Sequence, residues 1–427
     1  MRHKHTSLGQ LALGLDNAQT HYDLLHQEQR GIAILWERGA ADGHRWIKLR
    51  PDDPEIPAIL RATSSRNDTY ITPNEFSGWR LVRLLRSLRA VYVDLDGCGS
   101  LEDVLDCLAD QRLPCPSVAL YSGRGMHLYW LLQPLPPKAL PVWQRIEDAL
   151  IAALAPLGAD PAAKDCTRLL RLVGTRNAHN GEEVVGHILD GHQWSLRQLA
   201  FEVLGTEGKG RKSAEVRDLR ARRPRPDQAI QGSIYARWLL VYRDLLTISE
   251  YYSHRIPAGH RDKWLFLAGA ALSWFTHPQG IEAEIASLGR LHTDLEASDW
   301  LAAASPNLSR ALDAAAGKAM TWCGQEVDPR YRFRRQTLFA WLGPIITPEL
   351  QPKLRAILPD SLARERKVER DSARYATNYT KQGVRASNVE KRAQAQAMRG
   401  QGLTLREIAA SLDLGKSTIE RWCKRVP

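Results

Sequence analysis

The segment "VYVDLDGCGS", residues 91–100, places two carboxylates, Asp94 and Asp96, at the end of an apolar run. In a β-strand, residues i and i+2 project from the same face, so a strand that ends here sets both carboxylates side by side. Two like charges at this separation are unfavourable unless a positive charge lies between them. The segment therefore predicts a buried strand whose end faces a cation.

The composition is that of a globular protein without membrane spans. The chain has 427 residues, enough for two or three domains, and 44% of them are hydrophobic. No stretch approaches the roughly 20 apolar residues that a membrane span requires. The first ten residues lack the apolar core of a signal peptide, and the six cysteines form no CxxC pair. We expect a cytoplasmic protein with no membrane partner, no zinc site and no disulfide framework.

The net charge is +11, which suits a polyanionic partner, and the charge is unevenly spread. Residues 361–427 contain 15 Lys or Arg and 7 Asp or Glu, and residues 205–226 contain 8 basic and 3 acidic residues. Both stretches are basic enough to contact nucleic acid, although solvated linkers have the same composition.

Residues 1–204 are predicted to form a mixed α+β domain. A helix is expected over residues 138–156, where apolar side chains recur at three- and four-residue spacing. The expected strands are short, rich in β-branched or aromatic residues, and bounded by turn residues. They cover residues 31–36, 45–50, 69–73, 90–96, 117–122, 126–132 and 183–189.

The rest of the chain divides by composition. Residues 205–232 are expected to be a basic linker, and residues 233–358 an all-helical domain, because nearly every segment there has helical periodicity. Residues 359–392 are charged and polar with few large apolar groups, which predicts a connector. Residues 393–427 become periodic again and form a further small domain.

A second polar stretch, "YSGRGMHLYW" at residues 121–130, predicts a β-hairpin, since two apolar runs flank a glycine-rich turn. Ser122, Arg124 and His127 lie in or beside that turn. A hydroxyl, a guanidinium, an imidazole and exposed backbone N–H groups can together hold phosphate. The alternative for His127 is a structural histidine packed among apolar residues.

A third stretch, "GADPAAKDCTRLLRLVGTRN" at residues 158–177, combines carboxylates with arginines. Arg168 and Arg171 are three residues apart and share one side if this segment is a helical turn. A surface helix with ordinary ion pairs is the alternative. The polar residues of this stretch are Asp160, Asp165, Arg168, Arg171 and Arg176.

Together the three stretches indicate phosphoryl-transfer chemistry. Several carboxylates select a hard divalent cation, Mg²⁺ or Mn²⁺, and leave positions on it for substrate phosphates. Such ions can activate a 3′-hydroxyl and stabilise a leaving pyrophosphate, while arginine and histidine hold a triphosphate.

The same three motifs, in this order and about 30 residues apart, resemble those of the archaeo-eukaryotic primase superfamily, the primase-polymerases. "SGRGMH" resembles the second motif of that superfamily, and "DPAAKDCTRLLRLVGTRN" is similar to the third motif of its plasmid and mobile-element branch. The third motif departs from the pattern at Val173, where proline is usual. The resemblance covers about residues 30–190.

The resemblance implies an RRM-like catalytic core with an N-terminal module of helix and strands. It makes Asp94 and Asp96 metal ligands, completed by Asp160 or, as the second candidate, Asp165. The catalytic residues that it implies are Asp94, Asp96, Asp160, Asp165 and His127. Nucleoside triphosphates would be held by Ser122, Arg124, His127, Arg168, Arg171 and Arg176.

Two other interpretations compete with a primase. "VDLDG" also resembles the first motif of the haloacid-dehalogenase phosphatases, in which the first Asp is a nucleophile, but the "SGRGMH" hairpin has no place in that family. A non-catalytic replication initiator or regulator on a primase fold is the other. Intact Asp94, Asp96 and His127 argue against it.

The C-terminal stretch "MRGQGLTLREIAASLDLGKSTIERWCKR", residues 398–425, predicts two short helices joined by a tight turn. Thr404 and Glu407 form a capping box for the first helix. The pattern resembles the helix-turn-helix of resolvases and many regulators, in which the second helix enters the major groove. Side chains expected to contact duplex DNA are those of Lys416, Ser417, Thr418 and Arg421; a protein-contacting hairpin is the alternative.

These observations favour a DNA primase or primase-polymerase, which is a nucleotidyltransferase. It would make primers on single-stranded DNA with Mg²⁺ or Mn²⁺. It would replicate a plasmid, phage or other mobile element, attach to duplex DNA through its C-terminal helices, and work with a separate replicative helicase.

Overall fold

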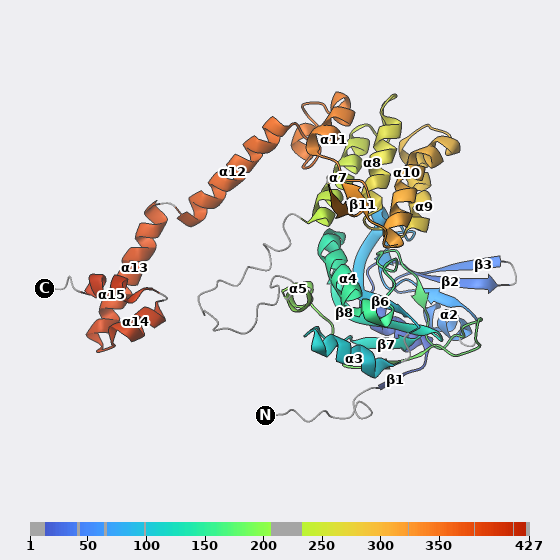
Figure 1. Cartoon of the computed structure of the whole chain (residues 1–427), viewed down its shortest axis with the longest axis horizontal. Coiled ribbons are helices and arrows are strands. Elements are labelled where there is room, and N and C mark those ends of the chain that lie inside the picture. Colours follow the sequence, from blue (N-terminus) through green and yellow to red (C-terminus); the bar gives the residue numbers. More distant parts are fainter. Residues whose placement is uncertain are drawn as a thin grey trace. The chain divides into compact units, whose positions relative to one another are not determined.

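The computed structural model describes residues 13–40, 43–63, 66–97, 100–205, 233–322, 324–379, 381–412 and 414–423. The chain divides into two compact units, residues 1–357 and 358–427, which are described separately (Figure 1). The predicted basic linker at 205–232 lies outside the described residues, apart from its first residue. Among the described helices, none combines the length and the apolar character needed to cross a bilayer.

The first unit contains a six-stranded antiparallel sheet in the order β1-β10-β7-β8-β6-β5. Its longest strand, β6, lies between β8 and β5 and is buried on both faces over residues 88–93, as the apolar run before Asp94 predicts. Strands β7 and β8 form the predicted hairpin, so the order places the hairpin directly beside the aspartate strand. The strands span Leu13–Leu15 (β1), Glu75–Phe76 (β5), Leu85–Asp96 (β6), Val118–Tyr121 (β7), Gly125–Leu135 (β8) and Val185–Ile188 (β10).

Helix α4, Leu140–Leu154, covers the sheet and confirms the helix expected over residues 138–156. It is bonded to β6 as well as packed on it. The indole Nε1 of Trp143 donates to the carbonyl oxygen of Ala90 over 2.7 Å, and Tyr92 donates its backbone N–H to Glu147 Oε1 over 2.8 Å. The other helices of this half are α1 (Ala18–His26), α2 (Ile56–Thr63), α3 (Leu101–Asp110) and α5 (Leu196–Leu204).

A second, four-stranded antiparallel sheet has the order β3-β2-β4-β9. Its last strand comes from the third motif, about a hundred residues further along the chain than the strand with which it pairs. That pairing brings the arginines of the third motif to the sheet that the N-terminal segment builds. The strands span Ala33–Ala40 (β2), Gly43–Leu49 (β3), Thr69–Ile71 (β4) and Leu170–Arg171 (β9).

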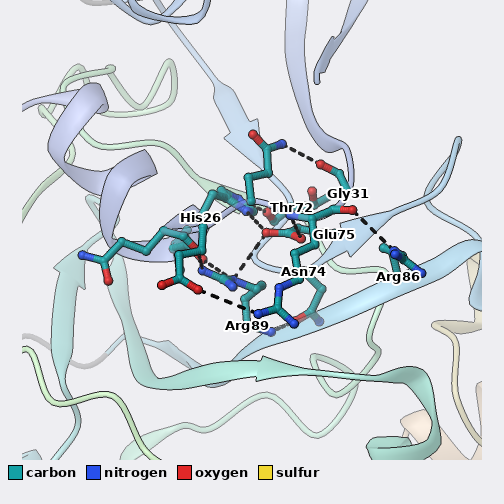
Figure 2. A network of polar contacts seen from close by, with 12 residues as sticks. His26, Gly31, Thr72, Asn74, Glu75, Arg86 and Arg89 are labelled. Atoms are coloured by element: carbon teal, nitrogen blue, oxygen red, sulfur yellow. Dashed lines mark hydrogen bonds and ion pairs between the residues drawn. The ribbon is translucent and has the colours of Figure 1, made fainter. Parts of the chain in front are cut away.

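A buried polar network holds β6 in place five residues before Asp94 (Figure 2). The guanidinium of Arg89 on β6 lies 3.4 Å from Glu75 Oε1 on β5, and the two side chains are 1% and 0% exposed. Glu75 also contacts His26 of α1 over 3.5 Å. Asn74 accepts the backbone N–H of Arg89 over 2.8 Å. The network therefore ties α1, β5 and the residue before β5 to the strand that carries the aspartates.

The segment from residue 233 to 357 is mainly helical, as predicted, but it also contains a β-hairpin, β11 (Met320–Trp322) with β12 (Gln325–Val327). The all-helical prediction was wrong at this point. The helices of residues 233–357 are α7 (Ile234–Tyr251), α8 (Arg261–Leu272), α9 (Pro278–His292), α10 (Ala297–Ala315) and α11 (Arg335–Leu342). Short 3-10 turns span Val82–Leu84 (η2), Pro137–Ala139 (η3), Ala155–Leu157 (η4), Gly343–Ile345 (η5) and Gln351–Lys353 (η6).

The helical segment makes polar contacts with the α+β part that precedes it. Glu284 of α9 accepts the backbone N–H of Val82 over 2.5 Å, and Arg83 donates to Ser287 Oγ over 2.8 Å. Tyr235 of α7 donates its hydroxyl to Asp148 of α4. Both segments therefore belong to the unit of residues 1–357.

The second unit consists of α12 (Asp360–Tyr379), α13 (Lys381–Gly400), α14 (Leu405–Ser411) and α15 (Lys416–Cys423). Ala395, Ile408 and Ile419, one from each of the last three helices, are fully buried against one another. Thr404 and Glu407 form the predicted capping box at the start of α14. Two short helices lie where the pattern of residues 398–425 predicts them, while Asp413 and residues 424–425 lie outside the described residues.

Candidate active site

The two aspartates lie at the end of β6 opposite the hairpin. Asp94 pairs directly with His127 across β6 and β8, so both side chains project from the same face. His127 Nε2 lies 3.5 Å from Asp94 Oδ1. His127 is therefore part of the aspartate cluster, and it is buried at 4% exposure.

The third motif approaches the same strand end through backbone hydrogen bonds. Asp96 donates its N–H to the carbonyl oxygen of Gly158 over 2.9 Å, and Asp160 donates its N–H to the carbonyl oxygen of Asp94 over 2.9 Å. A Cβ on Gly158 would lie 2.3 Å from the carbonyl oxygen of Asp96, and its φ is +86°. Glycine at this position lets Asp160 lie beside the two aspartates.

Asp165, the second candidate for the third carboxylate, is engaged in its own turn. Its Oδ1 accepts the backbone N–H and the hydroxyl of Thr167 over 3.1 and 2.7 Å. It lines the same pocket, and its backbone carbonyl oxygen accepts the hydroxyl of Tyr92 on β6 over 2.5 Å, whereas Asp160 donates its N–H to the carbonyl oxygen of Asp94 itself. The geometry therefore favours Asp160 over Asp165 as the partner of Asp94 and Asp96.

A guanidinium supplies positive charge between the carboxylates. Arg168 Nη2 lies 3.5 Å from Asp94 Oδ2 and 3.3 Å from Asp160 Oδ2, and its Nη1 lies 3.9 Å from Asp165 Oδ2. The side chain of Arg168 is 20% exposed, so these interactions are only partly screened by water. The cation predicted for this strand end is a divalent metal ion, and Arg168 adds positive charge there from the protein itself.

The negative charge of the cluster is not fully compensated at Asp96. Burial, followed by the charges of Asp94 and Asp160, raises the pKa of Asp96 above its ordinary value, although Arg124 and Arg168 oppose this. Burial lowers the pKa of His127 despite the nearby Asp94. The imidazole is therefore neutral at neutral pH, and its Nδ1 finds no hydrogen-bond partner among the described residues.

The hairpin turn is held in place by the end of the third motif. Asn177 Nδ2 donates to the carbonyl oxygen of Ser122 over 2.9 Å, and Asn180 Nδ2 donates to that of Gly123 over 2.8 Å. Ser122 is nearly buried and Arg124 is exposed at the rim. The turn that is predicted to hold phosphate therefore faces the same space as the carboxylates.

The other two arginines of the third motif, Arg171 and Arg176, lie at different places and not on one side of a helical turn. The predicted helical turn is instead a turn followed by strand β9, because Leu170 and Arg171 pair with β4. Arg171 Nη1 lies 2.7 Å from Asp68 Oδ1. Arg176 has an exposed position and bonds through its backbone to residues 66 and 68. Its side chain is not among those that line the pocket, unlike the other nucleotide-binding residues that the resemblance implies.

A pocket of about 520 Å³ joins these groups. It lies between the sheets and the start of helix α9, within the first unit. Its polar lining includes every predicted catalytic residue. The lining residues are Trp36, Tyr70, Arg80, Asp94, Asp96, Ser122, Arg124, His127, Asp160, Asp165, Thr167, Arg168, Leu169, Leu170, Arg171, Asn177, His277, Gln279 and Gly280.

Sequence reasoning missed several of these residues. Trp36 and Tyr70 come from β2 and β4, and His277 and Gln279 from the start of α9. His277 caps that helix, accepting the backbone N–H of Gln279 on Nδ1 over 3.3 Å. No local motif marks these residues, because long-range packing alone brings them to the pocket; only the tryptophan and tyrosine in short amphipathic strands carry a weak signal.

The donor set fits a hard divalent cation. Asp94, Asp96 and Asp160 offer only carboxylate oxygens, the ligands that Mg²⁺ and Mn²⁺ prefer, and burial together with the charges of Asp94 and Asp160 raises the pKa of Asp96. Across the part of the chain that the structure describes, no three His, Cys, Asp or Glu side chains converge closely enough to hold an ion as they stand. Arg168 occupies part of the space between two of the carboxylates.

The residues predicted to contact duplex DNA begin helix α15 in the second unit. Lys416 and Ser417 are its first two residues, Thr418 is half-buried, and Arg421 is exposed. Ile419 between them is fully buried in the small core. The arrangement keeps one side of α15 packed inward and leaves Arg421 accessible.

Comparison with known proteins gives one relative of similar extent. The chain is 25% identical over 359 residues to a replication protein of Clostridium perfringens, an alignment that covers 80% of this chain and 79% of the relative. No protein-family model matches the chain.

Solved structures with some likeness are primases. The primase-polymerase (AEP) domain of cyanophage S-2L has a TM-score of 0.34 and 19% identity, and covers 44% of this chain and 96% of that domain. The primase RepB' has a TM-score of 0.30 and 16% identity, covering 70% of this chain and 98% of that one. At these TM-scores the likeness by itself carries no conclusion about activity.

Proposed function

We propose that this protein is a DNA primase, able in principle to act as a primase-polymerase, that synthesises primers on single-stranded DNA during replication of a plasmid or other mobile element. The observation that carries the proposal is the convergence of Asp94, Asp96, Asp160 and His127 with the glycine-rich hairpin turn in one pocket. The relative from Clostridium perfringens is named a replication protein, which supports a role in replication.

The carboxylates supply the metal site of this proposal. Asp94, Asp96 and Asp160 would hold Mg²⁺ or Mn²⁺, which neutralises phosphate charge and lowers the pKa of a 3′-hydroxyl. The 3′-hydroxyl would give up its proton to water, its oxygen would form a bond to the α-phosphorus of the incoming nucleotide, and the bond from that phosphorus to the bridging oxygen would break, so that pyrophosphate leaves.

The basic and neutral donors hold the triphosphate in this proposal. Arg124 at the rim and Arg168 inside the pocket supply guanidinium groups for phosphate oxygens. His127 lines the pocket, and the tautomer protonated on Nε2, which the adjacent Asp94 carboxylate favours, would offer that N–H to Asp94 or to a phosphate oxygen. Ser122 adds a hydroxyl at the glycine-rich turn. Arg171 is shared with Asp68, so it positions the pocket wall.

The alternatives are less well supported. A phosphatase of the haloacid-dehalogenase type needs Asp94 free as a nucleophile, but here Asp94 lies between His127 and Arg168. A non-catalytic initiator has no use for three adjacent carboxylates and a buried neutral imidazole around an open pocket. We therefore keep the nucleotidyltransferase as the first hypothesis.

The test is primer synthesis by the purified protein with a single-stranded template, labelled nucleotides and Mn²⁺. Asp94→Asn and Asp96→Asn should each lower incorporation by several orders of magnitude, because losing a metal ligand removes transition-state stabilisation. Template affinity and thermal stability should stay close to wild type.

The matched control is Asp110→Asn, an exposed aspartate at the end of α3 that lies away from the pocket. It should keep full activity. Wild-type incorporation that survives in the Asp94→Asn, Asp96→Asn double variant would overturn the assignment.

A second part of the proposal concerns residues 398–423. We propose that α14 and α15 form a helix-turn-helix that binds duplex DNA, supported by their shared core and by the excess of basic residues in 361–427. Removing residues 358–427, the whole second unit, should weaken duplex binding and flatten its salt dependence, because phosphate contacts release counterions.

Primer synthesis on short single strands should continue in the shortened protein, since the proposed active site lies in residues 1–357. Gel-shift titrations of duplex at several salt concentrations measure the first effect. An unchanged duplex affinity would assign the second unit to a protein partner, such as the replicative helicase that we expect to work beside this primase.

A further inference from the structure

A row of aromatic side chains crosses the four-stranded sheet at right angles to its strands. Trp46 on β3 pairs with Trp36 on β2, Trp36 pairs with Tyr70 on β4, and Tyr70 pairs with Arg171 on β9. Directly paired residues of neighbouring strands project from the same face of a sheet. Trp46, Trp36 and Tyr70, here called the aromatic row, therefore form one continuous surface.

The rings of the aromatic row contact one another in sequence. The centroids of Trp46 and Trp36 are 5.6 Å apart with nearly parallel planes, and those of Trp36 and Tyr70 are 5.1 Å apart. The guanidinium of Arg171 lies 5.0 Å from the Tyr70 ring. The row thus ends on a cation, Arg171, at its Tyr70 end, which is here called the inner end.

Its outer end is also basic. Trp79 meets Trp46 edge to face at 5.0 Å. Arg80 lies 5.3 Å from the Trp46 ring, and Lys48 lies 5.6 Å from the Trp79 ring. Trp46 is 37% exposed, an unusually open position for a tryptophan that packs against two others. This end of the row is therefore accessible from solvent and surrounded by positive charge.

The inner end opens into the proposed active site. Trp36, Tyr70 and Arg171 line the same pocket as Asp94, and so does Arg80, which reaches it from beside Trp46. The aromatic row is thus continuous with the carboxylate cluster, and a ligand that extends outward from the pocket along this sheet meets rings and cations in turn.

Aromatic side chains beside cations along one groove are the chemistry that binds single-stranded nucleic acid, because unpaired bases have exposed π-faces and their phosphates attract Lys and Arg. In a duplex, the bases are already stacked on one another. We propose that the aromatic row contacts the unpaired bases of the template strand as it enters the pocket, with Lys48 and Arg80 facing its phosphates. This deepens the proposed function and rests on it.

The central variant is Trp46→Ala, chosen because Trp46 is the most exposed ring of the row. Titration of the full-length protein with labelled oligothymidylate should give at least about fivefold weaker binding, the loss expected when one base–aromatic contact is removed. Trp46→Phe should restore most of it. An abasic oligonucleotide of equal length should bind wild type and Trp46→Ala alike, because it has no bases to contact.

The matched control is Trp322→Ala, a 65% exposed tryptophan on β11, outside the pocket lining. It should bind oligothymidylate as wild type does. If Trp46→Ala lowers the melting temperature, Lys48→Ala replaces it; this exposed side chain should weaken binding and reduce the salt slope by about one.

Two results would overturn the inference. One is equal oligothymidylate affinity for wild type, Trp46→Ala and Lys48→Ala. The other is a raised nucleotide KM in Trp46→Ala with unchanged oligonucleotide affinity, which would assign the row to the incoming nucleotide. Failure of the proposed function is seen separately: a wild type that makes no primer while Trp46→Ala still loses oligonucleotide affinity refutes the primase and leaves the row as a single-strand surface.

Discussion

At the scale of single residues, the arrangement of the carboxylates depends on glycines as much as on aspartates. Asp94 and Asp96 are fixed by strand β6, but Asp160 reaches them only because Gly158 has no side chain. Gly125 plays the same part on the hairpin side, where a Cβ would lie 1.9 Å from the carbonyl oxygen of Leu95. Two chain segments can therefore approach the strand end from opposite sides.

Gly158→Ala should damage the site without touching a polar group. The new methyl would clash with the backbone of Asp96 and the residue would keep an unfavourable positive φ, so Asp160 must move. We expect the free energy of unfolding to fall by more than about 1 kcal/mol. Primer synthesis should fall further than the smaller fraction of folded protein would by itself produce. Urea denaturation and incorporation assays measure the two effects.

Gly181→Ala is the matched control for backbone strain, because Gly181 also has a positive φ, +75°, but has open space where a Cβ would lie. It should share the cost of φ and keep its activity. Similar activity losses in the two variants would mean that the close approach at Gly158 does not position Asp160.

At the scale of elements, the sequence predicted what local periodicity specifies. The aspartate strand, the glycine-rich hairpin and helix α4 are where alternation or helical spacing placed them. Strand β9 could not be predicted this way, since Leu170 and Arg171 become a strand only by pairing with β4. Trp36 and His277 were missed for the same reason: distant segments bring them to the pocket.

The buried network behind β6 leads to a second prediction. Glu75→Gln removes the charge that compensates Arg89, and both side chains are fully buried. Leaving one partner of a buried ion pair uncompensated costs about 3–5 kcal/mol. The free energy of unfolding, measured with urea, should fall by an amount in that range, and primer synthesis should fall as β6 loosens.

Glu28→Gln breaks an exposed ion pair with Arg30 and serves as its control. Exposed pairs contribute about 1 kcal/mol at most, so this variant should unfold close to wild type. If the two variants were equally stable, the network in Figure 2 would not anchor the strand.

At the scale of the whole molecule, buried Glu284 joins the helical segment to the sheets. Burial raises the pKa of Glu284 from 4.5 to about 8, although the Val82 N–H and nearby arginines oppose this. The folded protein therefore holds this proton over a range where the unfolded chain has lost it. The stability that this proton contributes is complete below pH 4.5 and is lost as the pH rises through about 8.

Glu284→Gln should remove this pH dependence, because glutamine resembles the protonated acid and can still accept the Val82 N–H. Between these limits, wild type should lose about 1.4 kcal/mol of stability per pH unit relative to the variant. Urea denaturation at several pH values checks this. Glu282→Gln, an exposed change on the same helix, should follow wild type, and a parallel pair of curves for wild type and Glu284→Gln would contradict the prediction.

The pocket wall that His277 and Gln279 provide has a consequence for how this gene can be recombined. A cassette of residues 358–427 can be exchanged between relatives without removing any residue that lines the pocket. A cassette that stops after residue 205 would separate the carboxylates from one wall of their own pocket and expose Val82 and Cys166, which contact the helical segment. Chimaeras that keep residues 1–357 from one parent should therefore stay active, and those that mix parents between residues 205 and 233 should need matched changes on both sides.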